Sequence, residues 1–111
     1  MAEKDEFKSQ HFLKEIEQAI QVANREVLSQ CLPPITKENI MPLALSVARQ
    51  RGQYLAEAFR IAESDGGEPP SEEEIETLRR NRKMYEEARK SFEALTHVIE
   101  RGYVYWATRR L

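Results

Sequence analysis

The chain has 111 residues, of which 41% are hydrophobic and 32% charged, and its formal net charge at pH 7 is −2. This length fits a single domain spanning residues 1–111, and the hydrophobic share is too high for a disordered chain. A single cysteine excludes a framework of intramolecular disulfides. The balanced charge argues against a partner that binds the whole surface through opposite charge.

Residues 4–30 are predicted to form the first helix. Its hydrophobic residues alternate in steps of three and four, which is the a/d spacing of a heptad repeat. They are Leu13, Ile16, Ile20, Ala23 and Val27. Pro33 and Pro34 cannot continue an α-helix, so a loop over residues 31–38 is expected to follow.

Residues 39–63 are predicted to form the second helix, which carries two hydrophobic rows. The first row is Ile40, Ala44, Val47, Tyr54, Ala58 and Ile61, interrupted by Arg51. The second row is Leu43, Ala48, Leu55, Phe59 and Ala62. Two rows predict that this helix is covered on two sides and is the central one. Small residues spaced by four also form a ridge that lets another helix approach closely; they are Ala44, Ala48, Gly52 and Ala56.

A third helix is predicted over residues 72–101 or beyond, after a loop over residues 64–71 that is rich in Gly and Pro. Ser71 and Glu74 have the spacing of a capping box, which places the start of this helix directly after Ser71. Its end is less well defined, because Gly102 could either terminate the helix or lie inside it. We expect the helix to continue, since Ile99, Gly102 and Trp106 keep the helical rhythm.

These elements predict an all-α fold of three long helices in an up-down-up antiparallel bundle. Such long helices in so short a chain leave a modest core. The two rows of the second helix therefore predict a homodimer, in which a second copy covers the remaining hydrophobic surface.

Aromatic residues close to the C-terminus are the second candidate interface, beside the ridge of small residues. Tyr103, Tyr105 and Trp106 lie close to arginines, a composition typical of interface anchors. They could equally fold back onto the first or second helix of their own chain. A dimer contact would satisfy both interpretations.

A basic surface suggests nucleic-acid binding as an alternative function. The candidate contacts are Arg79, Arg80, Arg82, Lys83, Arg101, Arg109 and Arg110. Consecutive residues of a helix spread around its circumference, however, and no helix-turn-helix signature is visible. The sequence does not favour this alternative.

A metal-binding or enzymatic dimer, with its site across the interface, is a second alternative. Glu93, His97 and Glu100 share one helix face and are weak candidate metal ligands. Cys31 follows the end of a helix, where a thiol is not activated. No nucleotide, metalloprotease or hydrolase motif occurs. We therefore expect no cofactor and no catalytic residue.

The expected location is the cytoplasm. The first residues lack the apolar region of a signal peptide, and no stretch approaches the ~20 apolar residues that cross a bilayer. Together these features predict a small non-enzymatic interaction or assembly protein, either an adaptor or a subunit of a larger complex. It would present a helical surface and its C-terminal aromatic cluster to a protein partner or to a second copy.

Overall fold

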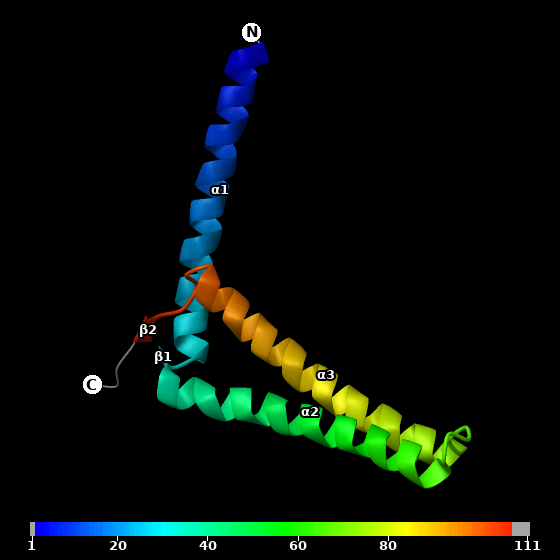
Figure 1. Ribbon diagram of the computed structural model, residues 1–111. Coiled ribbons are helices and arrows are strands. Elements are labelled where there is room, and N and C mark those ends of the chain that lie inside the picture. Colours follow the sequence, from blue (N-terminus) through cyan, green and yellow to red (C-terminus); the bar gives the residue numbers. More distant parts are fainter. Residues whose placement is uncertain (1, 108–111) are drawn as a thin grey trace. The chain divides into compact units, whose positions relative to one another are not determined.

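The computed structural model describes the backbone of residues 2–107 and the side chains of residues 3–106. Its three helices are α1 (Ala2–Cys31), α2 (Lys37–Asp65) and α3 (Glu72–Glu100) (Figure 1). Two short strands, β1 (Ile35–Thr36) and β2 (Trp106–Ala107), pair in parallel, with Ile35 opposite Trp106. The predicted all-α class is confirmed.

The chain divides into two compact units. One unit combines α1 and β1 with the last turn of α3 and the segment that follows it. The other unit is Glu38–Leu95, which holds most of α2 and α3. The antiparallel pairing of the second and third helices falls inside this second unit, whereas the place of α1 in a bundle stays a prediction.

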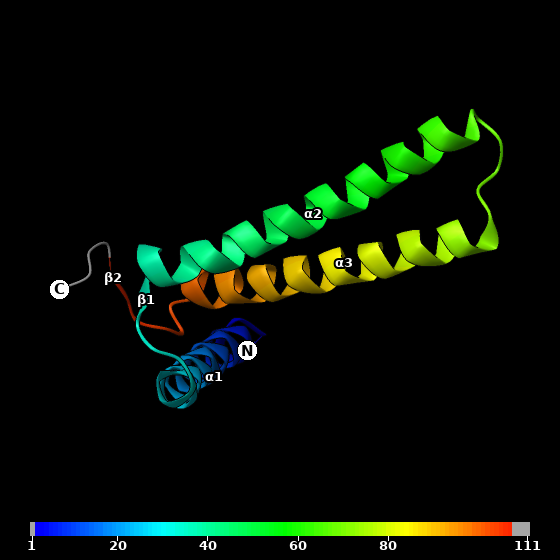
Figure 2. The same ribbon diagram turned by 90° about the horizontal axis from the view of Figure 1, so that it is seen from below.

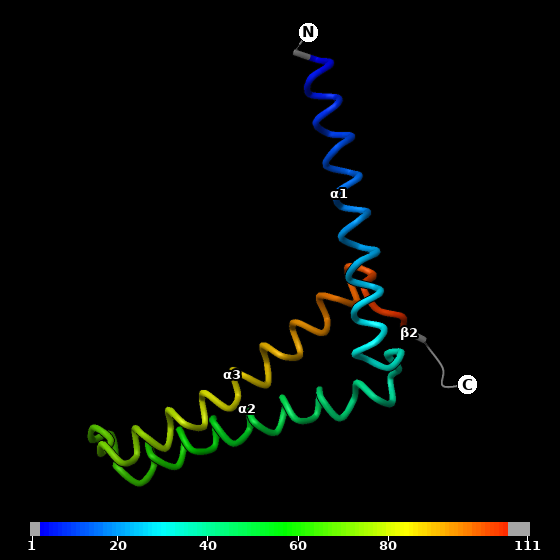
Figure 3. Tube along the Cα trace, turned by 180° about the vertical axis from the view of Figure 1, so that it is seen from behind, coloured from blue at the N-terminus to red at the C-terminus, as the bar shows by residue number. Residues whose placement is uncertain are grey.

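In the second unit, α2 and α3 run side by side in opposite directions (Figures 2 and 3). Val47 and Ile61 of α2 are only 8% and 4% exposed, and both belong to the first hydrophobic row expected from the sequence. Arg51, which interrupts that row, places its guanidinium 5.4 Å from the ring centre of Tyr85 on α3. Its Nε also donates a hydrogen bond of 3.3 Å to the Tyr85 hydroxyl. A cation over an aromatic ring explains why the inner row tolerates a charge.

Tyr54 of α2 adds to this contact, since its ring stacks on that of Tyr85 with the two centres 6.2 Å apart.

Helix α2 begins at Lys37, two residues earlier than expected, so Pro42 lies inside it. Pro42 lacks the N–H that would bond to the carbonyl of Glu38. This loss falls near the start of the helix, where the backbone is least constrained.

The start of α3 is the capping box that the sequence indicates. The Ser71 hydroxyl accepts the backbone N–H of Glu74 at 3.2 Å, and the Ser71 N–H donates to Glu74 Oε1 at 3.0 Å. Two backbone donors that the first turn would leave unpaired are thereby satisfied.

The end of α3 corrects the expectation that the helix continues past Gly102. The helix ends at Glu100, and Gly102 has a φ of +73°. The Tyr103 N–H donates to the Val98 carbonyl at 2.9 Å, and the Gly102 N–H donates to the Ile99 carbonyl at 3.1 Å. This pair of bonds is a Schellman motif, in which a left-handed glycine turns the chain away from the helix axis.

Candidate interaction surfaces

A continuous hydrophobic row lies on the exposed side of α2. We call it the α2 outer face, and it consists of Met41, Leu45, Ala48, Gly52, Leu55, Phe59 and Ala62. Successive members alternate in steps of four and three, so they form the a/d seam of a heptad repeat. Its large side chains are well exposed: 52% for Met41, 48% for Leu45, 49% for Leu55 and 70% for Phe59. Within the unit that holds α2 and α3, one side of α2 is thus covered by α3 and the other side is open.

The sequence-based second row differs from this face at its N-terminal end. Leu43 was expected there, but it is half-buried, and the exposed residues are Leu45 and Met41. Extending the steps of four and three backwards from Phe59 would have found both, since the same spacing passes through Gly52.

The ridge of small residues lies largely on the exposed surface. Ala44 is half-buried, whereas Ala48, Gly52 and Ala56 are exposed. In the part of the chain that the structure describes, a Cβ added at Gly52 would meet nothing within 4 Å. The ridge therefore leaves open space beside α2, as a surface for close helix approach requires.

The heptad row of α1 is exposed as well. Each of its five members is an exposed residue; they are Leu13, Ile16, Ile20, Ala23 and Val27. Phe12, beside this row, is 60% exposed. This helix thus offers a second hydrophobic seam.

The C-terminal aromatic segment packs in part against α1 in the first unit. The Arg25 Nε donates to the Gly102 carbonyl at 2.5 Å, and its guanidinium lies 5.6 Å from the ring centre of Tyr105. Val104 is only 5% exposed, and the Tyr105 carbonyl accepts the Ile35 N–H at 2.8 Å. The fold-back onto the first helix is therefore present.

Part of this aromatic segment stays open to a partner. Tyr103 is half-buried, but Tyr105 and Trp106 are 60% and 61% exposed. The Arg101 guanidinium lies 5.9 Å from the ring centre of Tyr103, and the hydrogen bond between them raises the pKa of Arg101. Val104 thus anchors the segment, and the rings of Tyr105 and Trp106 remain exposed. A contact of these rings with a partner or a second copy stays a prediction.

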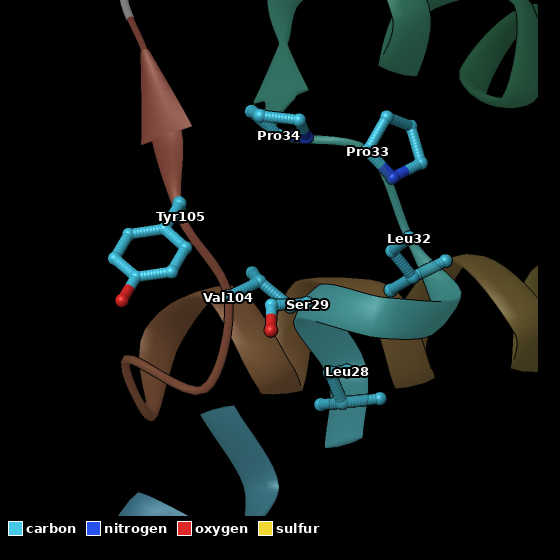
Figure 4. A pocket seen from close by; sticks show the side chains of 7 residues that line it. All are labelled: Leu28, Ser29, Leu32, Pro33, Pro34, Val104 and Tyr105. Atoms are coloured by element: carbon cyan, nitrogen blue, oxygen red, sulfur yellow. The ribbon is translucent and has the colours of Figure 1, made fainter. Parts of the chain in front are cut away.

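A small cavity lies where this segment meets α1 and the proline loop (Figure 4). It has a volume of about 50 Å³ and is lined by Leu28, Ser29, Leu32, Pro33, Pro34, Val104 and Tyr105. This volume holds one or two water molecules, whereas ligand sites usually measure about 300–1,000 Å³. Its lining is almost entirely apolar, so the cavity suits packing rather than chemistry.

The predicted basic residues lie in different parts of the chain. Arg79 pairs with Glu76 at 2.7 Å and Arg82 with Glu86 at 3.9 Å, while Arg80 and Lys83 are exposed. These four residues belong to the second unit, whereas Arg101 belongs to the first. Arg109 and Arg110 lie outside the described residues. Two members of the helical cluster thus already have acidic partners.

The weak metal candidates are not brought together with further ligands. Among the described residues, no group of three or more His, Cys, Asp or Glu side chains could hold a metal ion. Glu93 instead accepts a hydrogen bond of 3.1 Å from Arg89, and the free thiol of Cys31 is exposed. Within the part of the chain that the structure covers, no helix is long and apolar enough to cross a membrane.

Comparison with protein-family models, with curated proteins and with solved structures found no match for this chain. The exposed rows of α1 and α2 and the aromatic segment are therefore the features of the molecule that bear on its function.

Proposed function

We propose that this protein is a non-enzymatic interaction or assembly protein that works as a homodimer through its exposed helix faces. The observation that carries the proposal is the α2 outer face, a regular a/d row in which Leu55 and Phe59 are 49% and 70% exposed. Scattered hydrophobic residues are normal on a protein surface, but contiguous hydrophobic patches mark sites of association. An uninterrupted heptad row is the pattern that a second helix can cover.

The balance between buried and exposed residues supports this proposal. Among the described residues, few hydrophobic side chains are buried; they are Ile35, Val47, Ile61 and Val104. Many more large hydrophobic side chains are exposed, on α1, on α2 and in the aromatic segment. Covering part of this surface by a second copy would transfer apolar area from water, which favours association.

Nucleic-acid binding receives less support. Arg79 and Arg82 are engaged by acidic neighbours of their own helix. Phosphate contacts would have to compete with those pairs. The charged residues around the exposed rows are better explained as a solvated rim.

The molar mass in solution tests the proposal, measured by light scattering behind a sizing column at low and moderate salt. We expect the mass of two chains at both salt concentrations, because apolar contacts are not screened by ions. The mass of one chain at every concentration examined would refute it.

A further inference from the structure

We propose that the α2 outer faces of two copies pack against each other in antiparallel orientation, with Gly52 of each copy opposite Leu55 of the other. This inference rests on the homodimer proposed above and names its interface. In the same register, Leu45 faces the partner's Ala62 and Ala48 faces the partner's Phe59.

The sizes of the side chains carry this register. In an antiparallel pair of heptad seams, each a residue shares a layer with a d residue of the other helix. The α2 outer face has Leu45, Gly52 and Phe59 at one position and Ala48, Leu55 and Ala62 at the other. Each layer of this register then combines one large side chain with one small residue. Such alternation fills space at native density without strain.

A parallel pair would fit worse. It would stack Phe59 on the partner's Phe59 and Gly52 on the partner's Gly52, because equivalent positions share a layer in that orientation. Bulky layers would hold the helices apart, and the glycine layer would then enclose a void. The order of large and small side chains along the α2 outer face therefore favours the antiparallel orientation.

The charges beside the face favour the same orientation. Arg49 flanks its N-terminal half, whereas Glu63 flanks its C-terminal end. Antiparallel packing brings Arg49 of one helix toward the end of the other that carries Glu63, while parallel packing would place the two Arg49 residues at the same level. Opposed helix dipoles add to this preference.

This arrangement explains why a glycine occupies position 52. A glycine inside a helix weakens it, and no neighbouring group of the described residues lies within 4 Å of the place where a Cβ would be. Opposite Leu55 of a second copy, the missing side chain would give the leucine room. The other occupants of this face, α1 of a second copy or an unrelated protein, are outcomes that the following experiments separate.

Disulfide cross-linking tests orientation and register in the full chain with Cys31→Ser as background. A Leu45→Cys variant and an Ala62→Cys variant, carrying tags of different size, are mixed and mildly oxidised. We expect the mixed disulfide and neither homodimer, because two Leu45 positions would lie ~25 Å apart along the antiparallel helices. A matched pair at exposed positions off the face, Ser46→Cys with Gln53→Cys, should not cross-link.

Homodimeric disulfides at each position would overturn the antiparallel orientation. A wild-type dimer that forms no cross-link between these positions would overturn the α2 interface but leave the proposed function intact. A wild-type monomer would instead refute the proposed function itself, so the two failures can be told apart.

Gly52→Leu distinguishes layered packing from unspecific adhesion. Leucine forms helices better than glycine, and among the described residues nothing lies within 4 Å of a Cβ at this position, so the variant should fold. It would nevertheless place a second large side chain opposite Leu55, so we expect loss of the dimer. Gln53→Leu, one residue away on the exposed surface, should remain dimeric. A dimer of unchanged or increased strength with Gly52→Leu would overturn the proposed packing.

Discussion

Gly102 and Gly52 show that the effect of replacing a glycine on stability depends on its backbone conformation. Gly102 sits at a φ of +73°, and a Cβ there would lie 3.3 Å from Gln21 Nε2, whereas Gly52 is inside a helix with open space around it. We expect Gly102→Ala to lower the free energy of unfolding by about 1–2 kcal/mol. In the dilute, monomeric protein, where no second copy faces position 52, Gly52→Ala should raise it by about 0.5–1 kcal/mol. Urea unfolding of both variants measures these changes, and a shift of the same sign in both would contradict the argument.

Glu74 gives the capping box a pH dependence. The Ser71 N–H donates to its carboxylate and lowers the pKa of Glu74 below the ordinary value of 4.5. The unfolded chain therefore binds the proton more readily, so this contribution to stability is full above the ordinary pKa. It is lost as the pH falls through the lower pKa of the folded state. Urea unfolding from about pH 6 to about pH 3 should show a weaker loss of stability for Glu74→Gln than for the wild type.

At the scale of a single element, Ser71, which caps the start of α3, should matter more than Ser91 inside the helix. Ser71→Ala removes the acceptor for the Glu74 N–H, and we expect a loss of about 0.5–2 kcal/mol in the free energy of unfolding. Ser91→Ala is the matched control, because its hydroxyl only bonds back to the Glu87 carbonyl in mid-helix. Alanine should be neutral or mildly stabilising there. Equal losses in the two variants would show that the cap contributes nothing.

The elements also show where sequence reasoning succeeds. The start of α3 could be predicted because the signal is local, confined to Ser71 and the residues up to Glu74. Its end could not, since Gly102 fits both a helical repeat and a terminating turn. The turn at Gly102 also makes a contact with a distant segment, because Arg25 of α1 donates a hydrogen bond to the Gly102 carbonyl. The periodicity of a single segment carries no information about such contacts with distant segments.

For the candidate surfaces too, local spacing could be read from the sequence, whereas contacts between distant segments could not. The ridge through Ala48 and Gly52 was visible in the sequence, because spacing alone defines it. The sequence did not show which side of α2 would pack on α3, since both sides are hydrophobic. The inner side is decided by contacts such as Arg51 with Tyr85, in which a residue that breaks the hydrophobic pattern becomes part of the packing. The α2 outer face emerges only when that side is known.

For the whole molecule, folding and association should be linked. A dimer makes stability depend on protein concentration, and a hundredfold increase adds about 2.7 kcal/mol per dimer. We therefore expect the Tm of the wild type to rise by about 5–10 °C over that range. Thermal unfolding followed by circular dichroism at two concentrations measures the shift.

Two α2 variants separate the contributions of the inner and outer sides to this shift. Phe59→Ala removes a side chain that is 70% exposed, so it should reduce the concentration dependence with little effect on the Tm of the dilute protein. Ile61→Ala removes a side chain that is only 4% exposed, and the resulting cavity should cost about 2–5 kcal/mol at every concentration. If Phe59→Ala instead lowered the Tm of the dilute protein as much as Ile61→Ala, the outer face would serve folding within one chain. The hydrophobic row would then be part of a core and not an interface.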